Sequence, residues 1–125
     1  MNKKILYYFA HPYTLKDEKG NNIHAGEEAN FNLCCIRSAK LLEKGIFIYS
    51  PIAHTHPIHI RSPYFLRKKE YKLWLDLDKK IMPVCKGIIL APGWEESHGC
   101  ILEKRLFEER GFKVLLYKDI IKENT

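Results

Sequence analysis

Four short and almost continuously apolar runs alternate with longer segments, and this pattern constrains the fold more than any other feature of the chain. The runs cover residues 4–10, 46–49, 87–91 and 113–117. A strand that lacks polar alternation is buried on both faces, as in parallel sheets covered by helices. The chain therefore predicts an α/β fold, namely a single Rossmann-like or flavodoxin-like domain with a parallel sheet of four to five strands flanked by helices.

The segments between the runs predict three helices, over residues 27–44, 66–84 and 97–110. In the first of them apolar side chains recur at helical spacing, and Gly45 supplies a stop. Gly111 ends the third helix in the same way. The apolar positions of the first helix are Ala29, Leu33, Ile36, Ala39 and Leu42.

Three other stretches predict loops or a loose end. Residues 16–28 are polar and contain glycines, which is typical of a loop. Residues 51–63 contain three prolines, so we expect a long loop there rather than a continuous helix or a central strand. Residues 118–125 are polar and predict a frayed end.

Size and charge narrow the class of protein. The 125 residues, 46% of them hydrophobic, suffice for one domain over residues 1–125 with its own core. The net charge of +6 favours anionic partners but does not choose between nucleotides and nucleic acid. No apolar run reaches the roughly 20 residues that span a membrane, so we expect a cytoplasmic protein without a membrane partner. The cysteines form no C-x-x-C pair and predict free, buried thiols: Cys34, Cys35, Cys85 and Cys100.

The turn from the third run into the last helix contains the strongest local signal for chemistry. Ser97 is a good N-cap, and a helix N-terminus is suited to binding an anion. The Glu103 side chain tilts back over Gly99, where no side chain blocks it. A phosphate site one turn from a carboxylate suits a ligand with a phosphate and an electrophilic carbon. The alternative is that Gly99 only permits close packing and Glu103 is a surface residue.

Asp78 interrupts the apolar stripe of the second predicted helix. A buried carboxylate needs either a partner or a chemical role, so a salt bridge to a neighbouring loop is the alternative. Asp76 lies on another side of the helix and is the better candidate for a solvated charge. The stripe consists of Tyr71, Trp74, Leu75, Ile81, Met82 and Cys85.

Histidines and basic residues gather after the second run. His54, His56 and His59 have no cysteine or carboxylate in a metal-binding frame, so we expect hydrogen bonds to a ligand or to the backbone rather than a metal. A basic cluster follows with aromatic residues among its members, a pattern that can bind single-stranded nucleic acid but more often forms a solvated face. Its members are Arg61, Arg67, Lys68, Lys69 and Lys72.

Together these segments resemble the nucleoside 2-deoxyribosyltransferase-like superfamily, and within it a small branch related to the 2′-deoxynucleoside 5′-phosphate N-hydrolases. The resemblance covers nearly the whole chain and rests on the order and spacing of its motifs. These are Tyr8–Tyr13, Ser50–Ile58, Trp74 with Asp78, and Gly93–Gly99 leading to Glu103. Two positions depart from the pattern: Ile101 replaces a glycine of some relatives, and Lys86 replaces a common acidic residue.

The resemblance implies cleavage or exchange of the N-glycosidic bond of a nucleotide or nucleoside, with hydrolysis of a 5′-monophosphate preferred. It assigns Glu103 as the nucleophile that attacks C1′, Asp78 as the residue that contacts or protonates the base, and Tyr8 as the group that positions Glu103. The resemblance implies no metal or organic cofactor. It does imply a homodimer or higher homo-oligomer. The expected substrate-binding residues are Ser97, Gly99, His11, Pro12, His54, His56 and Trp94.

Two other classes of function remain as alternatives. A non-catalytic nucleotide-binding or sensor module would keep the pocket without the chemistry. An RNA-binding protein would use the basic cluster, and its binding would depend steeply on salt. No recognised nucleic-acid motif is present, so nucleic acid is the less favoured partner.

Overall fold

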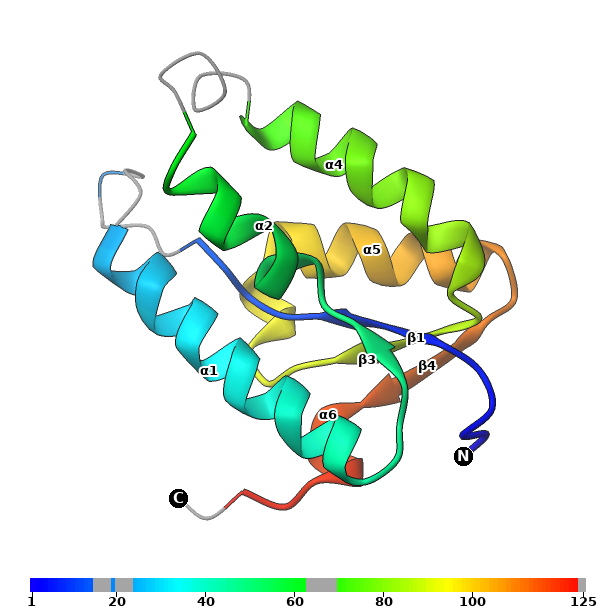
Figure 1. Ribbon diagram of the computed structural model, residues 1–125. Helices are drawn as coiled ribbons and strands as arrows, with labels where there is room; N and C mark the ends of the chain where they lie inside the picture. The colour runs from blue at the N-terminus through cyan, green and yellow to red at the C-terminus, as the bar shows by residue number, and fades with distance from the viewer. Residues whose placement is uncertain (15–18, 20–23, 63–69, 124–125) are drawn as a thin grey trace.

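The computed structural model describes residues 1–14, 19, 24–62 and 70–123 (Figure 1). Its centre is a four-stranded sheet in the order β2-β1-β3-β4, in which every pair of neighbours is parallel. This confirms the predicted α/β fold with a parallel sheet flanked by helices. The strands are β1 (Tyr7–Ala10), β2 (Ile48–Tyr49), β3 (Gly87–Leu90) and β4 (Lys113–Leu116).

Helices cover both faces of the sheet (Figure 1). Helices α1 and α6 pack on one face and α4 and α5 on the other, while α2 lies beside α1 at the β2 end. Two short 3-10 helices, η1 and η2, stand at the turns before and after β3. The bounds are α1 (His24–Glu43), α2 (Pro51–His59), α4 (Glu70–Ile81), η1 (Met82–Val84), η2 (Trp94–Glu96), α5 (His98–Glu109) and α6 (Tyr117–Ile120).

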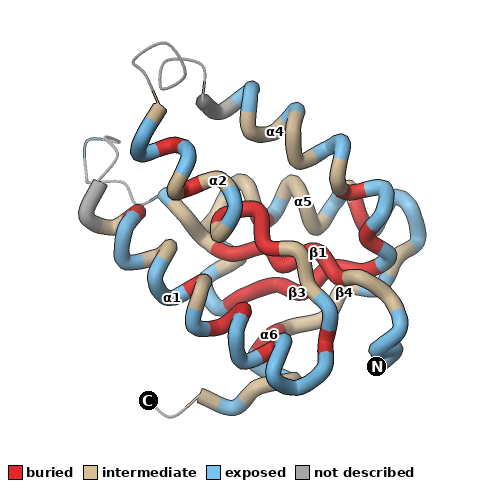
Figure 2. Tube along the Cα trace, viewed as in Figure 1, coloured by how far each residue is buried: buried red, intermediate tan, exposed pale blue. Residues whose placement is uncertain are grey.

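The two central strands, β1 and β3, are the most deeply buried elements, and the alternation of their side chains creates two cores (Figure 2). Along β1, Tyr7 and Phe9 face α1, whereas Tyr8 and Ala10 face α4 and α5. Successive strand residues point to opposite faces, so one strand supplies both layers. The second layer is completed by Met82, Cys85, Ile88, Leu90, Cys100 and Phe107.

Close packing around Tyr7 requires a glycine on the neighbouring strand. Gly87 is the register partner of Tyr7, and a Cβ built on it would stand 2.7 Å from the Tyr7 ring. Tyr7 is fully buried, and its hydroxyl donates a hydrogen bond of 2.9 Å to the carbonyl of Asn2. The ring has little room to yield, which explains the glycine at the start of β3.

The prediction of a loop over residues 51–63 is wrong for residues 51–59, which form α2. Pro51 occupies the first turn of the helix, where a backbone N–H has no partner to lose. The Ser50 hydroxyl caps the helix by accepting a hydrogen bond of 3.2 Å from the Ala53 N–H. Only Pro57 lies inside the helix, which ends two residues later. The Ser-Pro start signal therefore outweighs the later proline.

The first helix is confirmed, but its predicted apolar stripe faces outward. Leu33, Ile36 and Leu42 are exposed, Ile36 by 54%. The buried side is made instead by Glu27, Cys34, Arg37, Ser38 and Leu41. The helix buries polar side chains because they find partners across the layer, a pairing that periodicity does not reveal.

Several predicted boundaries shift. Helix α1 begins at His24, so residues 24–28 are not part of a loop, and residues 16–18 and 20–23 of that prediction lie outside the described residues. Residues 66–69 of the second predicted helix also lie outside them. The predicted fraying after Tyr117 is wrong for residues 118–123, because α6 and Glu123 pack against the α1 side of the sheet.

Candidate active site

Two acidic side chains meet a tyrosine on the α4/α5 face of the sheet. Tyr8 comes from β1, Asp78 from α4 and Glu103 from α5. The Tyr8 hydroxyl donates a hydrogen bond to Oε2 of Glu103, and its electrostatic and hydrogen-bonding interactions extend to Asp78. The structure thus brings together the three residues that sequence motifs single out for catalysis.

Burial raises the pKa of each of these three groups. It raises the pKa of Glu103 to about 8, and the charge of Asp78 adds to the rise while the bond from Tyr8 opposes it. Burial also raises the pKa of Asp78 to about 6. The pKa of Tyr8 lies well above its usual value because of burial and the two nearby carboxylates, so Tyr8 remains a hydrogen-bond donor. Carboxyl groups with raised pKa values are typical of acid catalysis.

Tyr49 is a fourth member of this cluster, and sequence reasoning assigned it only to a strand. It ends β2, opposite Tyr8, with 6.3 Å between the ring centroids. Burial and the charge of Asp78 raise its pKa. Within the described residues, the buried Tyr49 hydroxyl and the buried Oδ1 of Asp78 have no hydrogen-bond partner.

The start of α5 matches its prediction. Ser97 caps the helix, and its hydroxyl accepts a hydrogen bond of 3.2 Å from the Cys100 N–H. A Cβ on Gly99 would meet only the Ser97 hydroxyl, at 3.9 Å, so the space above Gly99 is open. The first N–H groups of an α-helix lack partners within the helix, which makes this end suitable for an anion.

The loop after β3 lies next to the loop after β1. Gly93 has a φ of 91°, and a Cβ on it would stand 3.4 Å from the ring of Pro12. Trp94 follows half-buried in η2, with the Lys104 ammonium 5.6 Å from its ring centroid. A cavity beside this loop is lined by Leu90, Pro92, Gly93, Trp94, Glu95, Leu116 and Lys118, on the side away from Tyr49.

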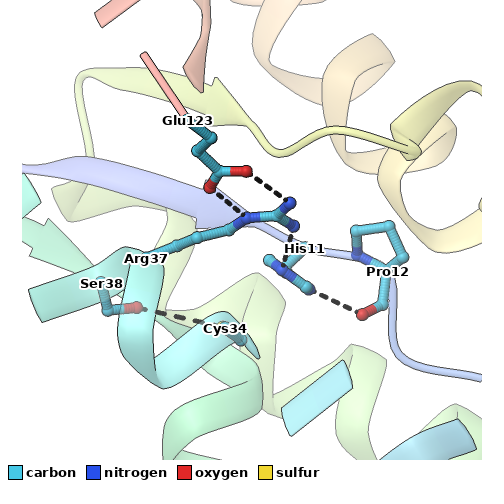
Figure 3. Close-up of polar contacts among 6 residues, drawn as sticks. All are labelled: His11, Pro12, Cys34, Arg37, Ser38 and Glu123. Carbon is cyan, nitrogen blue, oxygen red and sulfur yellow. Dashed lines mark hydrogen bonds and ion pairs between the residues drawn. The ribbon is translucent and has the colours of Figure 1, made fainter. Parts of the chain in front are cut away.

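His11 is buried in a polar network on the opposite face (Figure 3). Its Nδ1 donates a hydrogen bond of 2.8 Å to the carbonyl of Pro12, and its Nε2 accepts one of 2.9 Å from the Arg37 guanidinium. Arginine only donates, so this pairing fixes the neutral tautomer of the ring. Burial lowers the pKa of His11 to about 4. Arg37 in turn forms two hydrogen bonds to Glu123, 2.8 and 3.1 Å long.

His56 belongs to a second network, on α1 and α2. Its Nδ1 lies 2.6 Å from the Tyr13 hydroxyl, and its Nε2 lies 2.7 Å from Oε2 of Glu28. The ring is buried and stacked on Phe31, with 4.3 Å between centroids. Both nitrogens are therefore occupied by the protein. His54 is exposed, and its ring lies 6.2 Å from that of Tyr49.

Other candidates from the sequence take structural roles. Asp76 is exposed and pairs with Lys72 at 2.7 Å, as expected of a solvated charge. The cysteines are free and three are buried, and burial raises the pKa of Cys100 to about 12. In the basic cluster, Arg67, Lys68 and Lys69 lie outside the described residues.

The described residues contain no group of three or more His, Cys, Asp and Glu side chains placed to hold a metal ion. They also contain no helix long and apolar enough to cross a membrane.

Fold and site define a parallel α/β domain with a tyrosine-linked pair of buried carboxyl groups on one face of its sheet. The sequence matches the family model described as Domain of unknown function (DUF1937) over residues 5–119, and the chain belongs to this family. No match to the chain was found among curated proteins.

Proposed function

We propose that this protein cleaves the N-glycosidic bond of a nucleotide or nucleoside, preferably by hydrolysis of a nucleoside 5′-monophosphate. The observation that supports the proposal best is the cluster of Glu103, Tyr8 and Asp78, in which one tyrosine interacts with two buried carboxyl groups. Glycosidic bonds are cleaved by such pairs, one carboxyl group acting as nucleophile and the other as acid.

In the proposed first step, a Glu103 oxygen attacks C1′ of the sugar and forms a covalent ester. The C1′–N bond breaks, its electron pair leaves with the base, and the base receives the Asp78 proton. In the second step water attacks C1′, the bond to Glu103 breaks, and the proton of the water returns to Asp78. Exchange results when a second base replaces water.

The pair holds one proton near neutral pH, and the proposed roles require that proton to move. The pKa is about 6 for Asp78 and about 8 for Glu103, so the proton resides mainly on Glu103. The reactive form is the minor one, with the proton on Asp78 and the charge on Glu103. In that form the Tyr8 hydroxyl donates a hydrogen bond to Glu103 and stabilises its carboxylate.

The N-terminus of α5 supports the preference for a 5′-monophosphate. Ser97 and the open space above Gly99 lie one helical turn from Glu103, so a phosphate there would leave C1′ near the nucleophile. The net charge of +6 would assist the approach of an anionic substrate. Within this proposal Trp94 and His54 bind substrate, whereas His11 and His56 act through the loops that they hold.

We also propose a cytoplasmic homo-oligomer. Free thiols are typical of a reducing compartment. Apolar side chains on the outer side of α1 and at Phe47, which is 61% exposed, support self-association. Sedimentation of the wild type and of Ile36→Lys tests this, since a monomeric wild type would contradict it.

The activity is tested by incubating the protein with ribonucleosides, deoxyribonucleosides and their 5′-monophosphates, with and without a free acceptor base. Liberated base indicates hydrolysis, and a new nucleoside or nucleotide indicates transfer. Glu103→Gln should lose at least about 1000-fold in rate, because a nucleophile is removed. Glu108→Gln, on the same helix but paired with Lys104 at the surface, should keep wild-type activity. Binding without any base release would instead favour a nucleotide sensor.

A further inference from the structure

The Tyr49 hydroxyl and Oδ1 of Asp78 are buried polar atoms without a hydrogen-bond partner in the described part of the chain. Buried polar atoms of native proteins are nearly always satisfied, and an unsatisfied one is unfavourable by about 1–3 kcal/mol. Two such atoms in one cluster therefore call for a common explanation. A ligand that bonds to both atoms supplies it.

The two atoms belong to the same surroundings. Tyr49 lies opposite Tyr8 in the sheet, and Tyr8 interacts with Asp78. The charge of Asp78 also acts directly on the Tyr49 hydroxyl. Glu103 completes the cluster from α5, bonded to the same Tyr8 hydroxyl. Tyr49, Asp78 and Glu103 thus all surround the Tyr8 ring and hydroxyl.

We propose that Tyr49 and Asp78 together bind one edge of the leaving base, with Asp78 Oδ1 at a ring nitrogen and the Tyr49 hydroxyl at the neighbouring carbonyl or amino group. This inference rests on the proposed function and names a base-recognition residue in the same site. The ligand class is a planar nitrogen heterocycle whose ring nitrogen stands beside a polar substituent. A hydroxyl both donates and accepts, so Tyr49 serves a carbonyl oxygen and an amino group equally.

The experiment compares wild type, Tyr49→Phe and Tyr117→Phe by calorimetric titration and by base release. Tyr117 is the control from the opposite face of the sheet, since its buried hydroxyl lies on the α1 side and interacts with Glu123 there. The probes are the four common deoxynucleoside 5′-monophosphates, ribose 5-phosphate, and an analogue of the preferred nucleotide whose carbonyl or amino group is replaced by hydrogen.

Tyr49→Phe should bind the preferred nucleotide about ten-fold more weakly, the effect of one lost neutral hydrogen bond, and should bind ribose 5-phosphate as the wild type does. The analogue should bind wild type about ten-fold more weakly and Tyr49→Phe without further loss, because both changes remove the same bond. Tyr117→Phe should match wild type throughout. Thermal unfolding of Tyr49→Phe should show a stability at least equal to that of wild type, since an unsatisfied hydroxyl and no existing bond is removed.

The inference is overturned if Tyr49→Phe binds the nucleotide as tightly as wild type, or if it loses affinity equally for ribose 5-phosphate. Additive losses for the analogue and the variant would overturn it too. A wild type that binds nucleotides through Tyr49 but releases no base would contradict the proposed function and leave the Tyr49 contact standing. A wild type that binds none of the probes would contradict both.

Discussion

The two faces of the sheet differ in whether their buried polar groups have hydrogen-bond partners. On the α1 face, His11, Arg37 and Glu123 form a continuous chain of hydrogen bonds. On the α4/α5 face, Asp78 and Tyr49 keep buried polar atoms without partners among the described residues, and Glu103 has a raised pKa. Satisfied networks stabilise a fold, whereas unsatisfied groups are available to a ligand. The comparison indicates that stability resides on the first face and binding on the second.

Asp78→Asn should show the largest effect and tests the role of the second face. An amide cannot pass a proton to the leaving base, so the rate of base release should fall by about 100–10,000-fold. Asp76→Asn is the matched control, because Asp76 is an exposed neighbour paired with Lys72. Base release is measured over time with saturating nucleotide. Equal activity of the two variants would remove Asp78 from the mechanism.

Arg37→Ala tests the role of the first face. The guanidinium is buried, stacks over Tyr117 at 5.6 Å and bonds both His11 and Glu123. Its removal breaks a buried charged network and should lower the free energy of unfolding by about 3 kcal/mol. Urea denaturation measures this, with the exposed Lys40→Ala on the same helix as control. If Arg37→Ala lowers the free energy of unfolding by no more than Lys40→Ala does, the network does not stabilise the fold.

The pH dependence of stability should have opposite signs on the two faces. The pKa of Glu103 rises from 4.5 to about 8, so its contribution is full below pH 4.5 and is lost as pH increases to 8. The pKa of His11 falls from 6.5 to about 4, so its contribution is lost as pH decreases over that interval. Relative to wild type, Glu103→Gln should therefore gain up to about 5 kcal/mol at pH 8 and little at pH 4.5. Urea denaturation between pH 4 and pH 8 measures this, with Glu108→Gln as control. The same pH dependence of the free energy of unfolding in both variants would contradict the assignment to Glu103.

Tyr13→Phe should give the smallest effect and compares a satisfied hydroxyl with an unsatisfied one. The Tyr13 hydroxyl bonds His56, so its removal should destabilise the fold by about 1 kcal/mol. Tyr49→Phe removes a hydroxyl without a partner and should raise stability by up to about 1–3 kcal/mol. Thermal unfolding of both variants measures the difference. An equal loss of thermal stability in both variants would contradict the proposed difference between the two faces.

Apolar runs were enough to predict the sheet and its class, because a strand buried on both faces shows no polar alternation. The Ser97 cap was predicted correctly from its position before the last helix. Helix α2 was missed because Pro51 and Pro57 suggested a break, although the first turn of a helix tolerates proline.

Long-range pairings could not be predicted from local patterns. Arg37 and Glu123 stand 86 residues apart, and Glu123 belongs to the segment that was predicted to be a frayed end. Tyr13, His56 and Glu28 lie on three segments and meet only when α2 packs on α1. Tyr49 resembled an ordinary strand residue, since alternation records burial and not whether a hydroxyl has a partner.

The close contact of Gly87 with the Tyr7 ring has an evolutionary consequence. Any side chain at position 87 would collide with that ring, so the glycine and the aromatic residue form one unit of selection. Family members that replace the glycine should also carry a smaller residue at position 7. The two positions should therefore co-vary, and their joint change would mark branches of the family in which the centre of the sheet has been rebuilt.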